Sequence, residues 1–305
     1  MAAVASPPMR GARQEFRTGL EYLDAVTTLL RRIRSVHPTA GLYEPAELQW
    51  WWGQTSRSTD RLGQLFWFDD EGFPVAAVIA TAFRDEIQLD PIVMPDATSD
   101  WIVRVMERGL AHASESGIES VTLEVDSADE VLRSLLIGRG FTVDEGGGLV
   151  ETWLAANERP AISPLPDGYR LNRRIDVAGR AHHVANAERN HSDPEHRLQQ
   201  TSLYRPDLDL VVYDDHDDVA AYGLFWYDPE TAIGVVEPMR TEDAHQQRGL
   251  ARHVLTSGID LLVEAGAERI KICFEPENTA SKHLYLSAGF EPVRANDMLS
   301  GPTGT

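Results

Sequence analysis

The sequence has 305 residues but only one cysteine, Cys273, and a single thiol excludes a disulfide bond within the chain. One free cysteine fits a reducing compartment, so we expect the protein in the cytoplasm. No histidine is implied as a partner for Cys273. We therefore expect this residue in the core of a β-strand rather than as a catalytic nucleophile.

Long hydrophobic runs are also absent. The longest apolar segment, residues 75–83, has the length of a strand and is far shorter than the ~20 residues that a helix needs to cross a bilayer. The first 19 residues lack the apolar central region of a secretory signal, and we expect residues 1–19 to be disordered. The sequence therefore predicts no membrane partner.

Positive charge is scarce, because 28 Lys and Arg residues face 48 Asp and Glu residues, for a net charge of −20. This balance argues against binding of duplex nucleic acid, which needs clustered basic side chains. An acidic surface could steer a cationic amine toward a site, but it could equally serve solubility alone.

Several common motifs are missing. No G-x-S-x-G, Walker A or G-x-G-x-x-G sequence occurs, and the three glycines at 146–148 indicate a turn without a phosphate-loop context. Histidines 182, 183, 191 and 196 gather in one region, but their spacing matches no metal motif. We predict no metal site there. Contact of Glu188, His191 or Glu195 with a substrate is an open alternative for this region.

The most informative segment that is present is Gln246–Ala251, which reads Q-x-x-G-x-A. It separates a strand-like run, 232–241, from an amphipathic helical run, 247–265. The start of a helix presents backbone N–H groups without partners and positive dipole potential. Gly249 has no Cβ, so an anion can approach this backbone closely. The segment suits a pyrophosphate, although a glycine at a helix start also occurs without one.

A second pattern follows at 269–290. A strand over 269–274 precedes Asn278, a good N-cap, and Tyr285 follows seven residues later, almost two helical turns on. Both side chains should therefore face the same way. Gly289 then ends the helix, and Phe290 begins the next apolar strand.

In this order, strand, Q-x-x-G-x-A, helix, strand and N-x(6)-Y-x-x-x-G-F, residues 165–294 resemble the GNAT acyltransferase superfamily. The resemblance implies an N-acetyltransferase that uses acetyl-CoA as co-substrate and needs no metal. It also implies that the strand before the motif splays from its neighbour, and Pro238, which cannot donate to a β-ladder, has the placement for such a break. The cofactor-binding residues implied are Met239, Arg240, Thr241, Gln246, Gln247, Arg248, Gly249, Leu250, Ala251, Arg252, Asn278 and Tyr285.

Two residues, Glu237 and Tyr285, carry the chemistry that the resemblance implies. An alkylammonium has a pKa near 10.4, so a base must remove its proton before attack, and Glu237 is the candidate. Tyr285 would protonate the leaving thiolate. The alternatives are a strand-edge carboxylate in a salt bridge for Glu237 and a core residue for Tyr285.

The first half of the chain repeats the pattern of the second. A shift of 149 positions places Gly289 and Phe290 on Gly140 and Phe141 without a gap. The same shift aligns further residues of one type: Leu284 with Leu135, Gly266 with Gly117, Glu268 with Glu119 and Gly258 with Gly109. A period this long indicates two tandem domains of one fold rather than a solenoid.

The first copy lacks the residues that would carry the chemistry. Asp100 occupies the position of Gly249, where its carboxylate would repel a phosphate. Leu136 replaces Tyr285 and Gln88 replaces Glu237, while Ser99 and Asp100 form a helix N-cap. We infer that the first copy does not bind the nucleotide and serves as a scaffold, as a wall of the substrate site, or as both.

These observations predict an α/β (α+β) fold of two tandem GNAT-like domains, each a mixed, mostly antiparallel sheet flanked by helices, with a splayed central strand pair. We place a degenerate domain at 20–156, a proline-containing linker at 157–167 and the acetyl-CoA domain at 168–300. The expected reaction is direct acetyl transfer to an amine of a small molecule or peptide. A catalytically weak acyl-CoA-binding or sensing module is the alternative. The acceptor, the acyl length and the choice between monomer and homodimer stay open.

Overall fold

The computed structural model describes residues 12–54, 57–60, 62–83, 86–185 and 194–304. The chain divides into two compact units. Unit 1 contains residues 1–48, 56–148 and 296–305, and unit 2 contains residues 49–55 and 149–295. None of the helices in the described ranges combines the length and apolar character that crossing a bilayer requires.

Unit 1 is built on a mostly antiparallel sheet with helices α1 (Gly19–Val36), α3 (Ser99–Glu115) and α4 (Glu130–Gly138). In sheet order its main strands are β1 (Arg13–Arg17), β3 (Gln64–Phe68), β4 (Pro74–Phe83), β5 (Glu86–Val93), β6 (Ser120–Asp126) and the second half of β14 (Glu291–Pro302). The short strands β2 (Arg57–Ser58) and β7 (Thr142–Val143) pair with β4 and β14.

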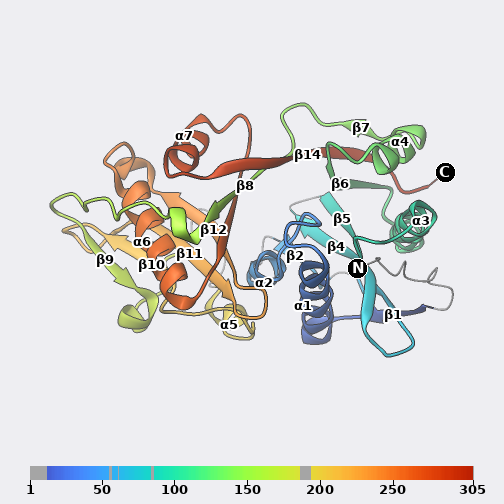
Figure 1. Cartoon of the computed structure of the whole chain (residues 1–305), viewed down its shortest axis with the longest axis horizontal. Helices are drawn as coiled ribbons and strands as arrows, with labels where there is room; N and C mark the ends of the chain where they lie inside the picture. Colours follow the sequence, from blue (N-terminus) through green and yellow to red (C-terminus); the bar gives the residue numbers. More distant parts are fainter. Residues whose placement is uncertain (1–11, 55–56, 61, 84–85, 186–193, 305) are drawn as a thin grey trace. The chain divides into compact units, whose positions relative to one another are not determined.

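Unit 2 has the same kind of sheet, and Figure 1 labels its elements. In sheet order its strands are the first half of β14, then β8 (Val150–Ala155), β13 (Arg269–Phe274), β12 (Ile233–Thr241), β11 (Val219–Asp228), β10 (Asp209–Tyr213) and β9 (Arg170–Arg173). Its helices are α5 (Glu195–Leu198), α6 (Leu250–Ala265), α7 (Thr279–Ser287) and the C-terminal part of α2 (Pro45–Gly53), with 3-10 turns at Ala156–Glu158, Arg174–Val177 and Asp243–His245.

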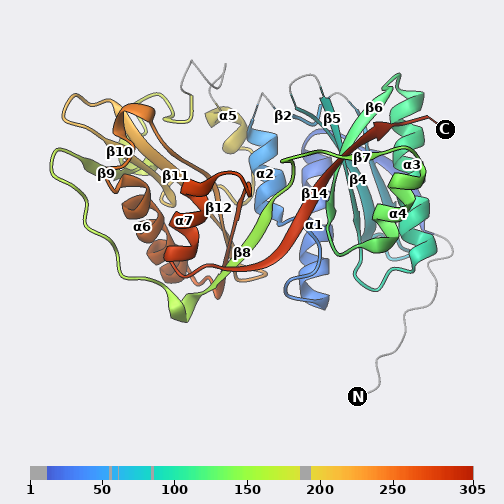
Figure 2. The ribbon, with the colours of Figure 1, turned by 90° about the horizontal axis from the view of Figure 1, so that it is seen from above.

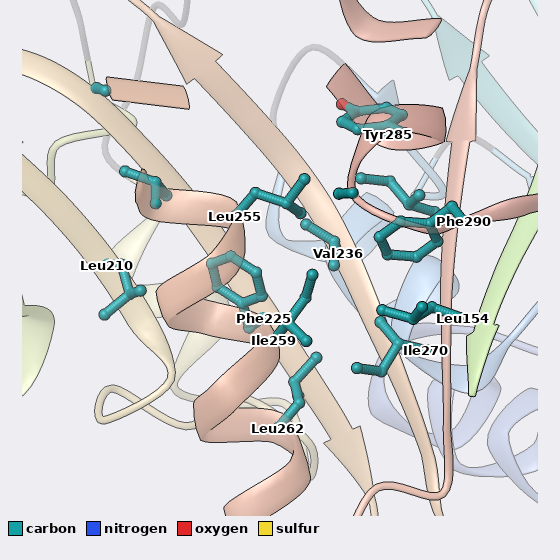
Figure 3. Packing of buried hydrophobic residues seen from close by; sticks show 14 of the residues in the cluster. Leu154, Leu210, Phe225, Val236, Leu255, Ile259, Leu262, Ile270, Tyr285 and Phe290 are labelled. Carbon is teal, nitrogen blue, oxygen red and sulfur yellow. The ribbon is translucent and has the colours of Figure 1, made fainter. Parts of the chain in front are cut away.

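Helix α6 covers one face of the unit 2 sheet and lies along β10 and β11 (Figure 1, Figure 2). Alternate strand residues such as Leu210, Phe225 and Ile270 turn toward it, as the two-residue period of a strand requires (Figure 3). Gly258 allows the close approach, because a Cβ there would lie 2.0 Å from Cζ of Phe225. A Cβ at Gly109, the aligned glycine of unit 1, would lie 2.8 Å from Val78 Cγ1.

The predicted splay is confirmed in unit 2. Strand β12 pairs in parallel with β13 only over residues 233–235, and beyond that point its ladder partner is β11 alone. The β11–β12 register also shifts, since Val236 pairs with Phe225 while Met239 pairs with Gly223. Glu237 and Pro238 therefore form a bulge opposite the single residue Leu224.

The predicted fold class, including the tandem arrangement of two mixed sheets flanked by helices, is confirmed. Several local expectations hold as well. The strand 269–274 has the predicted bounds, Asn278 caps α7 by accepting a hydrogen bond from the amide of Ser281, and Gly266 and Gly289 end α6 and α7 with φ of 111° and 99°.

The division into units differs from the predicted boundaries. Strand β8 pairs with β13, for example Thr152 with Ile272, so it belongs to unit 2 and not to a domain ending at 156. Strand β14 pairs with β8 up to Ala295 and with β6 from Asn296 on, so the second domain does not run to residue 300. The predicted linker is held along α6, where Ser163 N donates to Thr256 Oγ1 and its carbonyl contacts His253 Nδ1 at 2.6 Å.

Three smaller expectations are wrong. Residues 13–17 of the predicted disordered start form β1 and pair with β3, while residues 1–11 lie outside the described ranges. Helix α6 begins at Leu250 rather than 247, because Gln247 and Gly249 have φ of 59° and 82°, which a helix does not accommodate. The N-cap of α3 is Thr98, so Ser99 and Asp100 lie in its first turn.

Candidate functional site

The start of α6 is the most distinctive local structure of unit 2. Its N-cap is Gly249, and no side chain in the described part of the chain caps this end. Leu250 is 1% exposed and anchors the first turn in the core. The backbone N–H groups of this turn are therefore presented at a surface position, in positive dipole potential, as an anion site requires.

A cavity of about 430 Å³ lies at this helix start. It is lined by eleven of the twelve residues that the sequence predicts to contact a cofactor: Met239, Arg240, Thr241, Gln246, Gln247, Gly249, Leu250, Ala251, Arg252, Asn278 and Tyr285. The cavity therefore extends from the C-terminal half of β12, past the start of α6, to one face of α7.

Four further lining residues escaped the sequence reasoning: His245, Ala280, Ser281 and Leu284. The last three could have been found, because they lie between Asn278 and Tyr285 at helical spacing on the same face. His245 precedes the motif and carries no comparable signal.

Arg248 is the predicted residue that does not line the cavity. Its guanidinium donates to the hydroxyl of Tyr169 at 2.9 Å and to the carbonyl of Ala244 at 3.1 Å. The Tyr169 hydroxyl also lies 3.0 Å from His245 Nδ1. Through these contacts the Arg248 side chain stabilises the loop that precedes α6. Arg252, which does line the cavity, donates to Ser287 Oγ on α7.

Tyr285 reaches the cavity from α7 with only 7% of its surface exposed. Its ring packs near those of Phe274 and Phe290, with centroids 6.3 Å away in each case, and Figure 3 shows it within the apolar cluster. Burial, followed by the neighbouring Cys273 and Glu237, raises the pKa of Tyr285 to about 12. Its hydroxyl therefore keeps its proton at neutral pH and can donate it.

Glu237 lies at the bulge of β12 and is half-buried, but it is not among the residues that line the cavity. Its charge still reaches Tyr285, whose pKa it helps to raise. Its backbone carbonyl accepts a hydrogen bond of 2.6 Å from the indole N–H of Trp226. The half-buried Cys273 lies on β13 beside the same splay, as a strand residue.

The corresponding positions of unit 1 are arranged differently. Strands β4 and β5 pair in unbroken register from Ala76 with Val93 to Phe83 with Glu86, so no bulge interrupts them. Gln88, in place of Glu237, donates to the buried Asp90 at 2.7 Å. Thr98 caps α3 by accepting from the amide of Trp101, which satisfies a donor that stays uncapped in α6. Leu136, in place of Tyr285, is fully buried.

A buried polar cluster lies on the sheet face opposite α6. His182, His183 and Asp209 come within reach of a shared metal ion, but the hydrogen bonds indicate another state. His182 Nδ1 accepts from the amide of Val184 at 3.2 Å, so its Nε2 carries the proton and donates to Asp209 Oδ2 at 3.0 Å. In this structure these contacts form a hydrogen-bond network centred on Asp209.

Asp209 has two further contacts in this network. Tyr204 donates its hydroxyl to Oδ2 at 2.7 Å, and His183 Nε2 lies 2.8 Å from Oδ1. Burial would raise the pKa of Asp209, but His183 and His182 hold it below its usual range. Burial lowers the pKa of His183, only partly offset by Asp209.

A second cavity of about 620 Å³ is lined in part by His182, His183 and Tyr213, and it shares His245 with the first. Of the three residues named as possible substrate contacts, Glu188 and His191 lie outside the described residues. Glu195 is ion-paired with Arg174 at 2.9 Å, so its first role in this structure is to hold that buried guanidinium.

Comparison with known proteins agrees with this geometry. Residues 178–290 match the model of the family described as Acetyltransferase (GNAT) family. Two curated relatives, each named mycothiol acetyltransferase, are 28% identical to the chain. The match to the one from Beutenbergia cavernae covers 43% of this chain and 48% of the relative, and the match to the one from Renibacterium salmoninarum covers 71% and 68%. The chain thus spans about half the length of the first relative.

Solved structures share the fold at low sequence identity. A tandem GNAT protein from the clavulanic acid biosynthesis pathway superimposes with a TM-score of 0.68 at 13% identity, over 96% of this chain and 99% of the other. A GCN5-related N-acetyltransferase from Sphaerobacter thermophilus gives 0.62 at 14% identity, over 98% of each chain. Both likenesses extend through unit 1 as well as unit 2.

Proposed function

We propose that the chain is a tandem member of the GNAT acetyltransferase family and transfers an acetyl group from acetyl-CoA to an amine, with unit 2 as the catalytic unit. The observation that carries the proposal is the meeting of three features at one cavity. These are the interrupted strand β12, the uncapped start of α6 and the protonated hydroxyl of Tyr285.

The cavity offers acetyl-CoA two kinds of contact. Beyond residue 235 the β12 edge no longer pairs with β13, so the backbone of Met239, Arg240 and Thr241 can pair with the pantetheine arm as an added strand does. The amides from Gln247 to Arg252 hold the pyrophosphate, with Gly249 leaving open space where a Cβ would stand. Asn278 contributes as the cap of α7 at the cavity wall.

The reaction needs proton transfers at nitrogen and at sulfur and no covalent enzyme intermediate. Glu237 removes a proton from the ammonium form of the acceptor, directly or through water, and the freed nitrogen attacks the thioester carbonyl carbon. As the C–S bond breaks, Tyr285 donates its hydroxyl proton to the thiolate, and the second proton, which the nitrogen loses as it becomes an amide, restores the tyrosine hydroxyl. A backbone N–H at the bulge stabilises the negative oxygen that develops on the carbonyl.

Unit 1 does not bind acetyl-CoA in this proposal. Its strands β4 and β5 have no bulge, its helix α3 is capped by Thr98, and Asp100 places a negative charge in the first turn. In unit 2 the proposed binding depends on the opposite features: a bulged strand, an uncapped helix start and no acidic side chain at the position of Gly249. The protein therefore has one site per chain.

A catalytically weak module that binds or senses acyl-CoA is the second candidate. The observation that favours it is that Glu237, the proposed base, is not among the residues that line the cavity. Turnover of acetyl-CoA with an amine panel distinguishes the two candidates. The panel begins with the acceptor of mycothiol acetyltransferases, because both curated relatives carry that name.

The first measurement is titration calorimetry of acetyl-CoA against the wild type and Gly249→Glu. We expect about one site per chain in the wild type and no detectable binding in the variant, because the carboxylate occupies and repels the pyrophosphate position. Gly117→Glu is the matched control. Gly117 has a φ of 80° and open space around its missing Cβ, as Gly249 has with a φ of 82°.

Each other outcome contradicts a stated part of the proposal. Two sites per chain would show that unit 1 also binds the nucleotide. Absence of binding in the wild type would remove the acetyl-CoA function altogether. Equal binding by Gly249→Glu and Gly117→Glu would show that the start of α6 is not the pyrophosphate site.

A further inference from the structure

The bulge at Glu237 has a hydrogen-bond partner that neither the sequence motifs nor the relatives indicate. Trp226 lies on β11 with 1% of its surface exposed, and its indole N–H donates to the Glu237 carbonyl at 2.6 Å. The carbonyl belongs to the residue at which the β11–β12 register shifts, next to Pro238, which has no N–H. The indole therefore supports the backbone where regular ladder pairing is interrupted.

The indole is itself held from the other side. The ring of Tyr204 lies 5.9 Å from that of Trp226, and the Tyr204 hydroxyl donates to Asp209 Oδ2 at 2.7 Å. Asp209 is 1% exposed and receives His182 on the same oxygen. A continuous set of contacts thus leads from the buried Asp209 through Tyr204 and the buried Trp226 to the Glu237 carbonyl.

We infer that Trp226 is a positioning residue of the acyl-transfer site, which fixes the Glu237 carbonyl and so sets the direction of the backbone on both sides of the bulge. In this arrangement Tyr204 and Asp209 keep the indole in place. The inference rests on the proposed function, because the bulge carries both the Glu237 carboxylate and the backbone that faces the thioester.

A purely apolar core residue would not serve the same purpose. Phenylalanine can occupy much of the volume of Trp226, but it removes the indole N–H that donates to the Glu237 carbonyl, and loss of this hydrogen bond favours rearrangement of the bulge. A displacement of about 1 Å at reacting groups can cost on the order of 10²-fold in rate. The pyrophosphate contacts are on α6, so nucleotide affinity should change far less than turnover.

Trp226→Phe tests the inference, and the chain offers a matched control. Trp153 on β8 is also buried, and its indole N–H donates to the buried Glu151 Oε1 at 2.7 Å rather than to the Glu237 carbonyl. Trp153→Phe therefore removes an equivalent buried hydrogen bond from the same unit. Tyr204→Phe, which keeps the ring and removes the link to Asp209, is a second and milder variant.

For Trp226→Phe we expect kcat about 10–100-fold lower, while the acetyl-CoA dissociation constant stays within about threefold of the wild type. Hydrogen exchange of the amides over residues 233–241, followed by mass spectrometry without ligand, should accelerate in this variant and not in Trp153→Phe. Tyr204→Phe should show a smaller change in the same direction. It replaces Trp226→Phe as the test if that variant does not fold.

The inference is overturned if the Trp226 and Tyr204 variants match Trp153→Phe in both turnover and exchange, since that would be the behaviour of ordinary core residues. Failure of the proposed function is recognised separately, as a wild type that binds no acetyl-CoA or turns over no amine. In that event the exchange comparison still decides whether Trp226 positions the bulge.

Discussion

At the scale of single residues, the proposed mechanism gives Tyr285 both a packing role and a chemical one. The residue belongs to the apolar cluster and lines the cavity, and the pKa of its hydroxyl is raised to about 12. Phenylalanine preserves the ring and removes only the acid, so Tyr285→Phe should keep nearly the stability of the wild type. We expect kcat to fall about 10²-fold or more with little change in KM for acetyl-CoA.

The pH dependence follows from the direction of the same pKa shift. The protonated form is the reactive one, and it persists until the pH approaches 12, so Tyr285 should cause no loss of rate on the alkaline side below about pH 10. Profiles of kcat measured between pH 6 and 10 in both proteins check this. A wild-type alkaline fall that disappears in Tyr285→Phe would contradict a raised pKa.

At the scale of elements, close contact between helix α6 and the sheet depends on a missing methyl group. Ala is normally about 1 kcal/mol better than Gly inside a helix, but a Cβ at Gly258 would lie 2.0 Å from the Phe225 ring. Overpacking of this kind typically costs about 1–3 kcal/mol, so Gly258→Ala should destabilise the protein. Gly138→Ala in α4, where the Cβ meets open space, should be neutral or slightly stabilising.

Urea unfolding of the two glycine variants, each compared with the wild type, measures this difference. Equal stability of Gly258→Ala and the wild type would mean that Phe225 moves aside at little cost. The alignment of Gly258 with Gly109 was visible in the sequence. The reason for a glycine at these positions was not visible in the sequence, because it depends on which strand residue lies under the helix.

Features that depend on residues close together in the sequence were predictable, whereas contacts between residues far apart in the sequence were not. Strand 269–274 lies between a glycine stop and the residues that precede the cap of α7, so its bounds could be inferred from its neighbours. The bulge was predictable because proline cannot donate to a ladder. By contrast, Trp226, Tyr204 and Asp209 meet only through tertiary packing, and no spacing in the sequence brings them together.

At the scale of the whole molecule, the two units do not follow the order of the chain. Strand β8 precedes the predicted linker but pairs with β13 of unit 2, and residues 296–302 of β14 pair with β6 of unit 1. The linker was predicted from composition, whereas unit membership depends on strand partners. A tandem repeat visible as a shift of 149 positions therefore gave the number of domains correctly but misplaced their limits.

The returning strand gives the last prediction. In unit 1, Leu299 is fully buried and pairs with Leu123 of β6, and Gly301 approaches the Phe141 ring closely. Removing residues 296–305 should therefore destabilise unit 1 strongly, while the cavity residues, all of which lie in unit 2, stay in place. Calorimetry of the full and shortened chains, with and without acetyl-CoA, measures both effects.

We expect the shortened chain to lose the unfolding transition that acetyl-CoA does not shift and to keep the one that acetyl-CoA raises, because a ligand stabilises only the unit that binds it. Substitution of Leu299 by Ala in the full-length chain is the milder control, with an expected cost of about 2–5 kcal/mol in unit 1. Loss of the acetyl-CoA-dependent transition in the shortened chain would mean instead that the binding unit cannot fold without its neighbour.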